Sequence, residues 1–117
     1  MKSEFQHKQT KILSIIRAIP KGCVASYGQI ATIAGIPRGH RLVTRALREA
    51  NSDDALPWYR VIRGDGRCGM PKDSKGYIMQ FELLKSEGVL ANNGKVDMKH
   101  FQWKPDMDFL LFRPQDL

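Results

Sequence analysis

Arginine side chains are the most regularly spaced functional groups in this sequence. Arg38, Arg41, Arg45 and Arg48 recur at intervals of three or four residues, and no acidic residue follows the first of them until Glu49. On a helix, side chains at such intervals share one face. A merely solvated face usually mixes acids with bases. The pattern therefore favours a helical face that binds a polyanion.

The net charge of the chain is concentrated where these arginines lie. The 117 residues carry a formal charge of +7. Residues 1–48 contain nine Lys and Arg against one acid, a net of +8, whereas residues 49–117 contain ten against eleven, a net of −1. A basic segment of this kind is the electrostatic footprint of a nucleic-acid-binding protein.

Residues for metal, cofactor or membrane chemistry are few. Cys23 and Cys68 lack CxxC spacing and are expected to be small fillers, unpaired in a cytosolic protein. His7, His40 and His100 are scattered, so neither a metal nor a cofactor is expected. No apolar run approaches the ~20 residues that span a bilayer, and the N-terminus lacks the apolar stretch of a signal peptide. We expect a cytoplasmic protein without a membrane partner, associated with the nucleoid if it is bacterial.

The basic face needs a helix, and the sequence predicts a pair of helices around it. Ser26 and Gln29 fit a capping box for a short helix over residues 27–34, which Gly35 ends. A Gly/Pro turn then leads into a helix over residues 39–50, with an apolar stripe opposite the arginines. Two short helices joined by a tight turn resemble a helix-turn-helix.

Further elements are expected on either side of this pair. Apolar periodicity predicts helices over residues 5–19 and 75–87, and residues 58–62 are expected to be extended. The Asn-Asn-Gly sequence at 92–94 predicts a hairpin turn, and a hairpin beside a helix-turn-helix would be a wing. The predicted fold class is α+β, mainly α, a winged helix-turn-helix-like single domain.

Length limits the chain to one domain, since ~150 residues per domain is the usual prior. We place the domain at residues 1–105 and regard residues 106–117 as a C-terminal extension. The extension contains the apolar run Phe109-Leu110-Leu111-Phe112. We expect it to dock on the chain's own surface and not on a partner.

Five short motifs between residues 19 and 88 are informative through their order and spacing. They are Ile19-Pro20-Lys21-Gly22, Ser26-Tyr27-Gly28-Gln29-Ile30-Ala31, Arg41, Leu56-Pro57-Trp58-Tyr59-Arg60-Val61-Ile62 and Leu83-Leu84-Lys85-Ser86-Glu87-Gly88. Together they resemble the DNA-binding domain of the O6-alkylguanine-DNA alkyltransferases, over about residues 5–103. The resemblance implies the fold of the alkyltransferase C-terminal domain.

The chain departs from that family at the residue that does the chemistry. The family signature is Pro-Cys-His-Arg-Val, whose cysteine accepts the alkyl group, and here Trp58 and Tyr59 replace the cysteine and the histidine. Alkyl transfer needs a thiolate and a neighbouring base. An indole is no such nucleophile, and a phenol of pKa about 10 is a poor base. The chain therefore resembles the alkyltransferase-like proteins and is not expected to be an enzyme. Glu87, the family's acidic relay residue, is expected to be structural.

The resemblance implies docking in the minor groove of duplex DNA and flipping of a nucleotide. Arg41 would be the finger that replaces the flipped base, and Tyr27 would press on the rotating phosphate. Thr44 would permit close approach to the groove. Phosphate contacts are expected from Arg38, Arg45 and Arg48. The lesion pocket is expected to be lined by Trp58, Tyr59, Arg60, Val61 and Ser74.

The expected partner is double-stranded DNA containing O6-alkylguanine, bound by a monomer that hands the lesion to nucleotide excision repair proteins. Two alternatives stay open: an alkyltransferase that uses Cys23 or Cys68, and a winged-helix transcription regulator that reads undamaged sequence in the major groove.

Three further positions leave parts of the site open. The family often has an asparagine nine residues after the finger arginine, and here Ala50 stands there, with Asn51 next. Residues 68–71 differ from the Gly-rich stretch that follows the active-site segment in the family and is expected to form the outer wall of the pocket. Arg60 could instead form a surface ion pair with the acids at 53 and 54.

Overall fold

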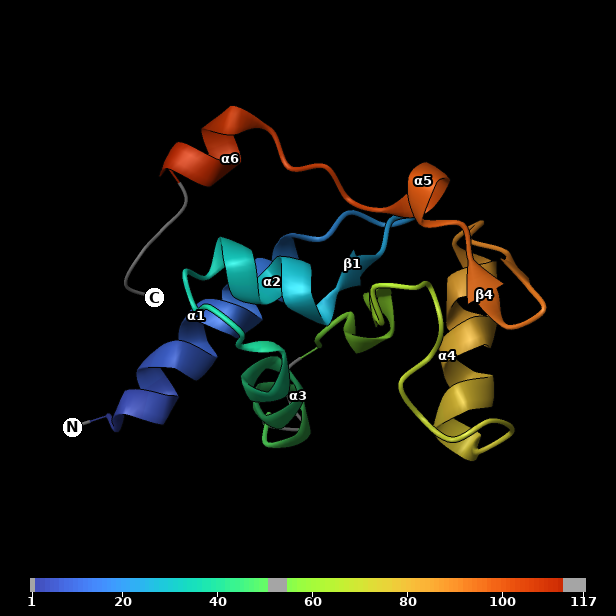
Figure 1. Cartoon of the computed structure of the whole chain (residues 1–117), viewed down its shortest axis with the longest axis horizontal. Helices are drawn as coiled ribbons and strands as arrows, with labels where there is room; N and C mark the ends of the chain where they lie inside the picture. The colour runs from blue at the N-terminus through green and yellow to red at the C-terminus, as the bar shows by residue number, and fades with distance from the viewer. Residues whose placement is uncertain (1, 51–54, 113–117) are drawn as a thin grey trace.

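The computed structural model describes residues 2–50 and 55–112. Its elements, in chain order, are α1 (Glu4–Ala18), β1 (Ala25–Ser26), α2 (Tyr27–Ile33), α3 (His40–Arg48), the 3-10 helix η1 (Trp58–Arg60), β2 (Val61–Ile62), α4 (Lys75–Ser86), β3 (Ala91–Asn92), β4 (Lys95–Val96), α5 (Met98–Phe101) and α6 (Met107–Phe112). The predicted class, α+β with helices dominant, is confirmed (Figure 1). Over the described ranges, no helix combines the length and apolarity needed to cross a bilayer.

Helix α1 begins at a capping box that the sequence analysis did not identify. The Ser3 hydroxyl accepts from the Gln6 amide, and the Gln6 side chain accepts from the Ser3 amide. Four apolar residues of α1 are buried in the core: Ile12, Leu13, Ile15 and Ile16. The helix ends at Ala18, two residues before the proline that cannot continue it.

Helices α2 and α3 form the predicted helix pair, with shorter bounds for α3. Gly35 has a φ of +74°, a left-handed conformation that glycine adopts without strain. Gly39 is the N-cap of α3, so the helix begins at His40 and ends at Arg48 instead of spanning residues 39–50. Arg38 therefore lies in the turn, with a φ of +56°, and is not part of the helix that carries the other arginines.

The predicted capping box of α2 forms only in half. The Ser26 hydroxyl accepts from the Gln29 amide at 3.0 Å, as expected. The Gln29 side chain, however, donates to the Trp103 carbonyl at 2.7 Å and accepts from the Gln102 side chain at 2.9 Å. This tertiary contact replaces the local one and ties α2 to the segment before α6.

A short parallel pair, β1–β2, lies between two apolar clusters. Ala25 pairs with Val61, and both belong to the larger cluster, which contains α1, α2 and α3. Val24 and Ile62 belong to a second cluster with residues from α4 and the hairpin. Because successive residues of a strand point to opposite faces, each face of this pair is covered by one cluster. The pair therefore joins the two halves of the molecule.

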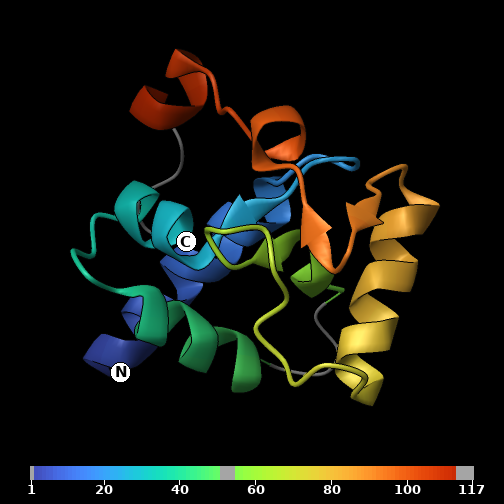
Figure 2. The same ribbon diagram turned by 45° about the vertical axis from the view of Figure 1, so that its right-hand side comes forward.

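The hairpin β3–β4 packs beside α4, as the orange and gold ribbons of Figure 2 show, and not beside α2 and α3. The turn between its strands has positive φ at Asn93 and Gly94, as the Asn-Gly sequence predicted. Gly66 packs so closely that an added Cβ would lie 2.2 Å from the Val96 carbonyl oxygen. The hairpin is therefore fixed to the second cluster, and the expected wing does not flank the helix-turn-helix.

The described part of the C-terminal extension packs on the chain itself. The Phe109 ring lies 5.1 Å from the Trp103 ring, in an edge-to-face arrangement, and packs against the larger cluster. The Asp106 carboxylate accepts from the Phe109 amide at 2.8 Å and so caps α6. This agrees with the prediction that the extension docks on its own domain, as far as residue 112.

Candidate nucleic-acid interface

The outer face of α3 presents the basic side chains. Arg41, Thr44, Arg45 and Arg48 are all exposed, and the buried side of the helix is formed by Val43 and Ala46. Within residues 2–50 and 55–112, neither Arg41 nor Arg48 has an ion-pair partner. These two guanidinium groups are available to an external anion.

Arg45 differs from its neighbours on the helix because it is already engaged. Its Nε lies 2.7 Å from a carboxylate oxygen of Glu49, one turn further along. The guanidinium also lies over the Phe5 ring of α1, 3.8 Å from the ring centre. The positive charge of Arg45 is therefore partly balanced within the chain.

A cavity of about 220 Å³ opens beside α3. It brings together residues from both predicted sets, the DNA-contacting one and the lesion pocket. Its lining consists of Tyr27, Thr44, Leu47, Arg48, Trp58, Val61, Met70 and Gln80. Two larger hollows, of about 570 and 540 Å³, lie elsewhere and do not include Trp58. The smaller cavity is the candidate site because it alone of the three joins Trp58 to the arginine-bearing helix.

The 3-10 helix η1 divides the predicted lesion pocket. Trp58 lines the cavity, whereas Tyr59 and Arg60 do not. Successive side chains of a 3-10 helix point about 120° apart, so three consecutive residues cannot face one cavity. The expectation that residues 58–62 are extended was wrong for this first part, and β2 begins only at Val61.

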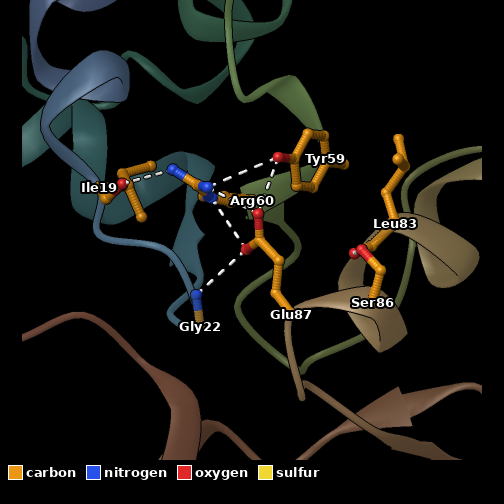
Figure 3. A network of polar contacts seen from close by, with 7 residues as sticks. All are labelled: Ile19, Gly22, Tyr59, Arg60, Leu83, Ser86 and Glu87. Carbon is orange, nitrogen blue, oxygen red and sulfur yellow. Dashed lines mark hydrogen bonds and ion pairs between the residues drawn. The ribbon is translucent and has the colours of Figure 1, made fainter.

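Tyr59 and Arg60 belong instead to a network around Glu87 (Figure 3). The Glu87 carboxylate accepts from the Tyr59 hydroxyl at 2.8 Å and from Arg60 Nη2 at 2.6 Å and Nε at 3.0 Å. It also accepts from the Gly22 amide at 3.1 Å, while Arg60 Nη1 donates to the Ile19 carbonyl at 2.8 Å. The network joins the loop after α1, η1 and the end of α4.

The network shifts the proton affinities of its members. Hydrogen bonds from Arg60 are the largest of the effects that lower the pKa of Glu87 from 4.5 to about 2, against the opposing effect of burial. Burial, followed by the bond to Glu87, raises the pKa of the Tyr59 phenol. Glu87 is therefore an anion held by an arginine, in agreement with its predicted structural role. The guanidinium of Arg60 is occupied by Glu87. The alternative partners of Arg60, the acids at 53 and 54, lie outside the described residues.

Two other predicted site residues have distinct positions. Tyr27 begins α2, is half-buried and lines the cavity, and burial raises the pKa of its phenol. Ser74 is the N-cap of α4, where its hydroxyl accepts from the Tyr77 amide at 3.2 Å. Ser74 is not among the residues that line the cavity.

Leu47 and Gln80 line the cavity but were not predicted as pocket residues, whereas Met70, which also lines it, falls in the stretch 68–71 expected to form the outer wall. Gln80 is the most distinctive, because it is a polar residue only 2% exposed. A signal was present, since Gln80 lies on α4 four residues before buried Leu84, where a core residue is expected.

Metal-binding clusters and cysteines were also sought among the described residues. These residues contain no group of three His, Cys, Asp or Glu side chains that could hold a metal ion. Cys23 is half-buried, Cys68 is buried, and neither lines the cavity or forms a disulfide. The positions of Asn51, Asp53 and Asp54 lie outside the described residues.

Comparison with known proteins gives a consistent set of relatives. Residues 7–89 match the family model described as 6-O-methylguanine DNA methyltransferase, DNA binding domain. A "DNA base-flipping protein" of Vibrio parahaemolyticus is 34% identical, over 81% of this chain and 94% of that protein. "Alkyltransferase-like protein 1" of Schizosaccharomyces pombe is 32% identical, over 82% of this chain and 94% of that protein.

Solved structures agree with the sequence relatives. The crystal structure of S. pombe Atl1 in complex with damaged DNA containing O6-carboxymethylguanine superposes with a TM-score of 0.78 at 30% identity. The match covers 90% of this chain and all of that one. A second S. pombe ATL–DNA complex matches with a TM-score of 0.75.

Proposed function

The chain belongs to the family of the 6-O-methylguanine DNA methyltransferase DNA-binding domain, and from this premise we propose that it is a non-enzymatic sensor of O6-alkylguanine in duplex DNA. It binds as a monomer, places α3 in the minor groove, turns the damaged nucleotide into the Trp58 cavity, and passes the complex to nucleotide excision repair. Its relatives include a protein named for base flipping and one crystallised on damaged DNA, which supports this assignment.

The observation that carries the proposal is the position of Trp58. It lies in the cavity next to the exposed face of α3, and by the sequence resemblance it replaces the family's acceptor cysteine. A base stacked on an aromatic side chain gains about 1–3 kcal/mol, comparable to the few kcal/mol that flipping costs. The cavity offers a base the ring of Trp58, but no cysteine lines it to remove an alkyl group.

The arginines of α3 support the DNA-binding part of the proposal. Arg41 and Arg48 project from the exposed face without an ion-pair partner among the described residues. Arg41 is the proposed finger that fills the space left by the flipped base, because its planar guanidinium can stack and donate hydrogen bonds. Arg48, which borders the cavity, is the proposed contact to a phosphate next to the lesion.

Paired binding measurements test the proposal. Duplexes identical except for one O6-methylguanine are titrated with the protein at a fixed, stated salt concentration, since affinity for DNA depends on salt. We expect tighter binding to the damaged duplex and no transfer of a labelled methyl group to the protein. Equal affinities for the two duplexes would overturn the proposal, and a methylated Cys23 or Cys68 would show an enzyme instead.

Arg41→Ala separates lesion recognition from general attraction to DNA. This variant should lose binding to the damaged duplex by a larger factor than binding to the undamaged one. Arg63→Ala removes the same charge from an exposed turn outside the cavity and serves as the control. A sequence-reading regulator would lose affinity for both duplexes equally in Arg41→Ala and would prefer one undamaged site.

A further inference from the structure

Gln80 presents a hydrogen-bond acceptor that the folded chain does not use. Its side chain is 2% exposed, and its Nε2 donates to the Tyr59 carbonyl at 3.0 Å and the Val61 carbonyl at 2.8 Å. Its Oε1 is buried and has no hydrogen-bond partner, the single case among buried side-chain N and O atoms over residues 2–50 and 55–112. Buried polar atoms are normally paired, so this exception needs an explanation.

The orientation of the amide is fixed by its neighbours. Reversing the amide would place Oε1 against two carbonyl oxygens, and neither carbonyl can donate a hydrogen bond. Both donors of Gln80 are therefore committed to η1 and β2, and Oε1 is left as the unpaired polar atom of a residue that lines the cavity. A ligand that satisfies this oxygen must bring an N–H or O–H donor.

The proposed ligand has one such donor on its base. An alkyl group on O6 removes the proton from N1, so the ring nitrogens and O6 can only accept. The exocyclic 2-amino group, which distinguishes guanine from the other bases in the minor groove, is the remaining donor. Guanine chemistry and the unpaired acceptor are therefore complementary.

Resting on the function proposed above, we propose that Gln80 Oε1 accepts a hydrogen bond from the 2-amino group of the flipped O6-alkylguanine, which makes Gln80 a specificity-determining residue. Trp58 contacts the base through its ring face, which any base can offer. Gln80 adds a contact that a purine without the amino group cannot make. Because Oε1 is shielded in the free protein, side chains in the wall must move aside, and unbranched Met70 is the one best suited to do so.

A cycle of protein and base changes tests this assignment. The duplexes carry O6-methylguanine or O6-methylhypoxanthine, which lacks only the 2-amino group, opposite the same base. The proteins are the wild type, Gln80→Met and, as a matched control outside the cavity, Gln102→Met. Loss of the amino group should weaken wild-type binding by roughly three- to tenfold, the worth of one hydrogen bond. Gln102→Met should lose affinity by the same factor when the amino group is removed, and Gln80→Met should lose less than about twofold.

The cycle separates recognition from a structural effect. Gln80→Met also loses the bonds to Tyr59 and Val61, but that loss affects both duplexes equally and cancels in the ratio. The assignment would be overturned if the wild type bound the two duplexes equally well. It would also be overturned if Gln80→Met lost as much affinity as the wild type when the amino group is removed. Neither result would contradict lesion binding itself. A wild type that does not prefer O6-methylguanine to guanine would remove the proposed function and the assignment with it.

A second measurement needs no variant and applies if Gln80→Met does not fold. The lesion is synthesised with a 15N-labelled 2-amino group and saturated with wild-type protein. Nuclear Overhauser contacts between the amino protons and the Gln80 side chain are expected in the complex. Their absence, with the base flipped, would refute the contact.

Discussion

Tyr59 follows Trp58 in η1 and belongs to the Glu87 network. Its hydroxyl donates to Glu87, and burial together with that bond raises the pKa of the phenol. The rings of Tyr59 and Trp58 lie edge to face, with centres 5.9 Å apart. A thiol placed at position 58 would therefore find no base beside it.

Trp58→Cys should accordingly bind damaged DNA but transfer no methyl group at a useful rate. The phenol of Tyr59 stays protonated at neutral pH, so it cannot activate the thiol. The variant is incubated with a duplex whose O6-methylguanine carries a labelled methyl group, and the label bound to the protein is counted. The double variant Trp58→Cys/Tyr59→His restores an imidazole and should exceed the single variant. Rapid labelling of Trp58→Cys alone would contradict the account.

Within residues 58–61, the sequence did not indicate the direction of each side chain. Trp58 and Val61, both predicted for the lesion pocket, line the cavity. So does Tyr27, which was predicted to press on the rotating phosphate. Tyr59 and Arg60 were assigned to the same pocket and instead contact Glu87. No local signal marked the 3-10 turn, because it depends on how η1 packs against α4.

Among the elements, α3 combines arginines of unequal availability. Arg48 has no ion-pair partner in the described part of the chain, whereas Arg45 pairs with Glu49 and stacks on Phe5. The even spacing of these residues in the sequence gave no hint of the difference, since Phe5 comes from another helix. The salt dependence of DNA binding should therefore differ between variants of Arg45 and Arg48, although the two residues look equivalent in the sequence.

Arg48→Ala should flatten the plot of log affinity against log salt by about 0.9 if one phosphate contact is lost. Arg45→Ala should change that slope less, because part of its charge is already balanced by Glu49. Titrations of an undamaged duplex at several salt concentrations measure both slopes, with Arg63→Ala as the reference. Equal changes in the two variants would show that DNA displaces Glu49 and Phe5 from Arg45.

Helix α6 offers a second test at this scale. Phe109→Ala should lower the free energy of unfolding by about 1–2 kcal/mol, since the ring is partly buried against Trp103. Leu111→Ala, on the same helix but 60% exposed, is the control and should be nearly neutral. Denaturant titration measures both. Affinity for DNA should not change, because α6 lies on the far side of the molecule from α3 (Figure 1). An unchanged free energy of unfolding in Phe109→Ala would show that the extension does not stabilise the domain.

Helices proved more predictable than their tertiary contacts. The ends of α2 and α4 follow from local chemistry, namely the hydroxyl caps at Ser26 and Ser74 and the left-handed Gly35 and Gly88. The partner of Gln29 did not follow, because the Trp103 carbonyl is far away in the sequence. Likewise the hairpin was predicted from its turn, but its place beside α4 was not.

For the molecule as a whole, the Glu87 network acts at the junction of the two apolar clusters. It links the loop after α1 to η1 and to the end of α4, next to the β1–β2 pair. The side chains of Arg60 and Glu87 are only 14% and 5% exposed. Removing one partner of such a pair leaves an uncompensated buried charge, so this contact should matter to the stability of the entire fold.

Glu87→Gln should reveal this contribution through its pH dependence. Because the folded-state pKa of Glu87, about 2, lies below its ordinary 4.5, ionised Glu87 stabilises the fold fully above pH 4.5. That stabilisation, roughly 3 kcal/mol, is lost as the pH falls from 4.5 towards 2. Denaturant titrations of both proteins between pH 7 and pH 2 should therefore give stabilities that converge in acid.

The exposed ion pair of Glu4 and Lys8 provides the control for this measurement. Glu4→Gln should follow the wild-type curve closely at every pH, because surface ion pairs contribute little. A Glu87→Gln curve parallel to the wild type down to pH 2 would mean that Glu87 does not act through its charge.

The β1–β2 pair has a consequence for the order in which the protein folds. Contacts among α1, α2 and α3 are comparatively local, whereas β1 must close long loops to meet β2 and the Phe101–Trp103 segment. Trp58 and Val61 reach the cavity only after β2 has docked. A refolding chain would therefore acquire its basic helix before its cavity, and with it an indiscriminate affinity for DNA before any ability to single out a damaged base.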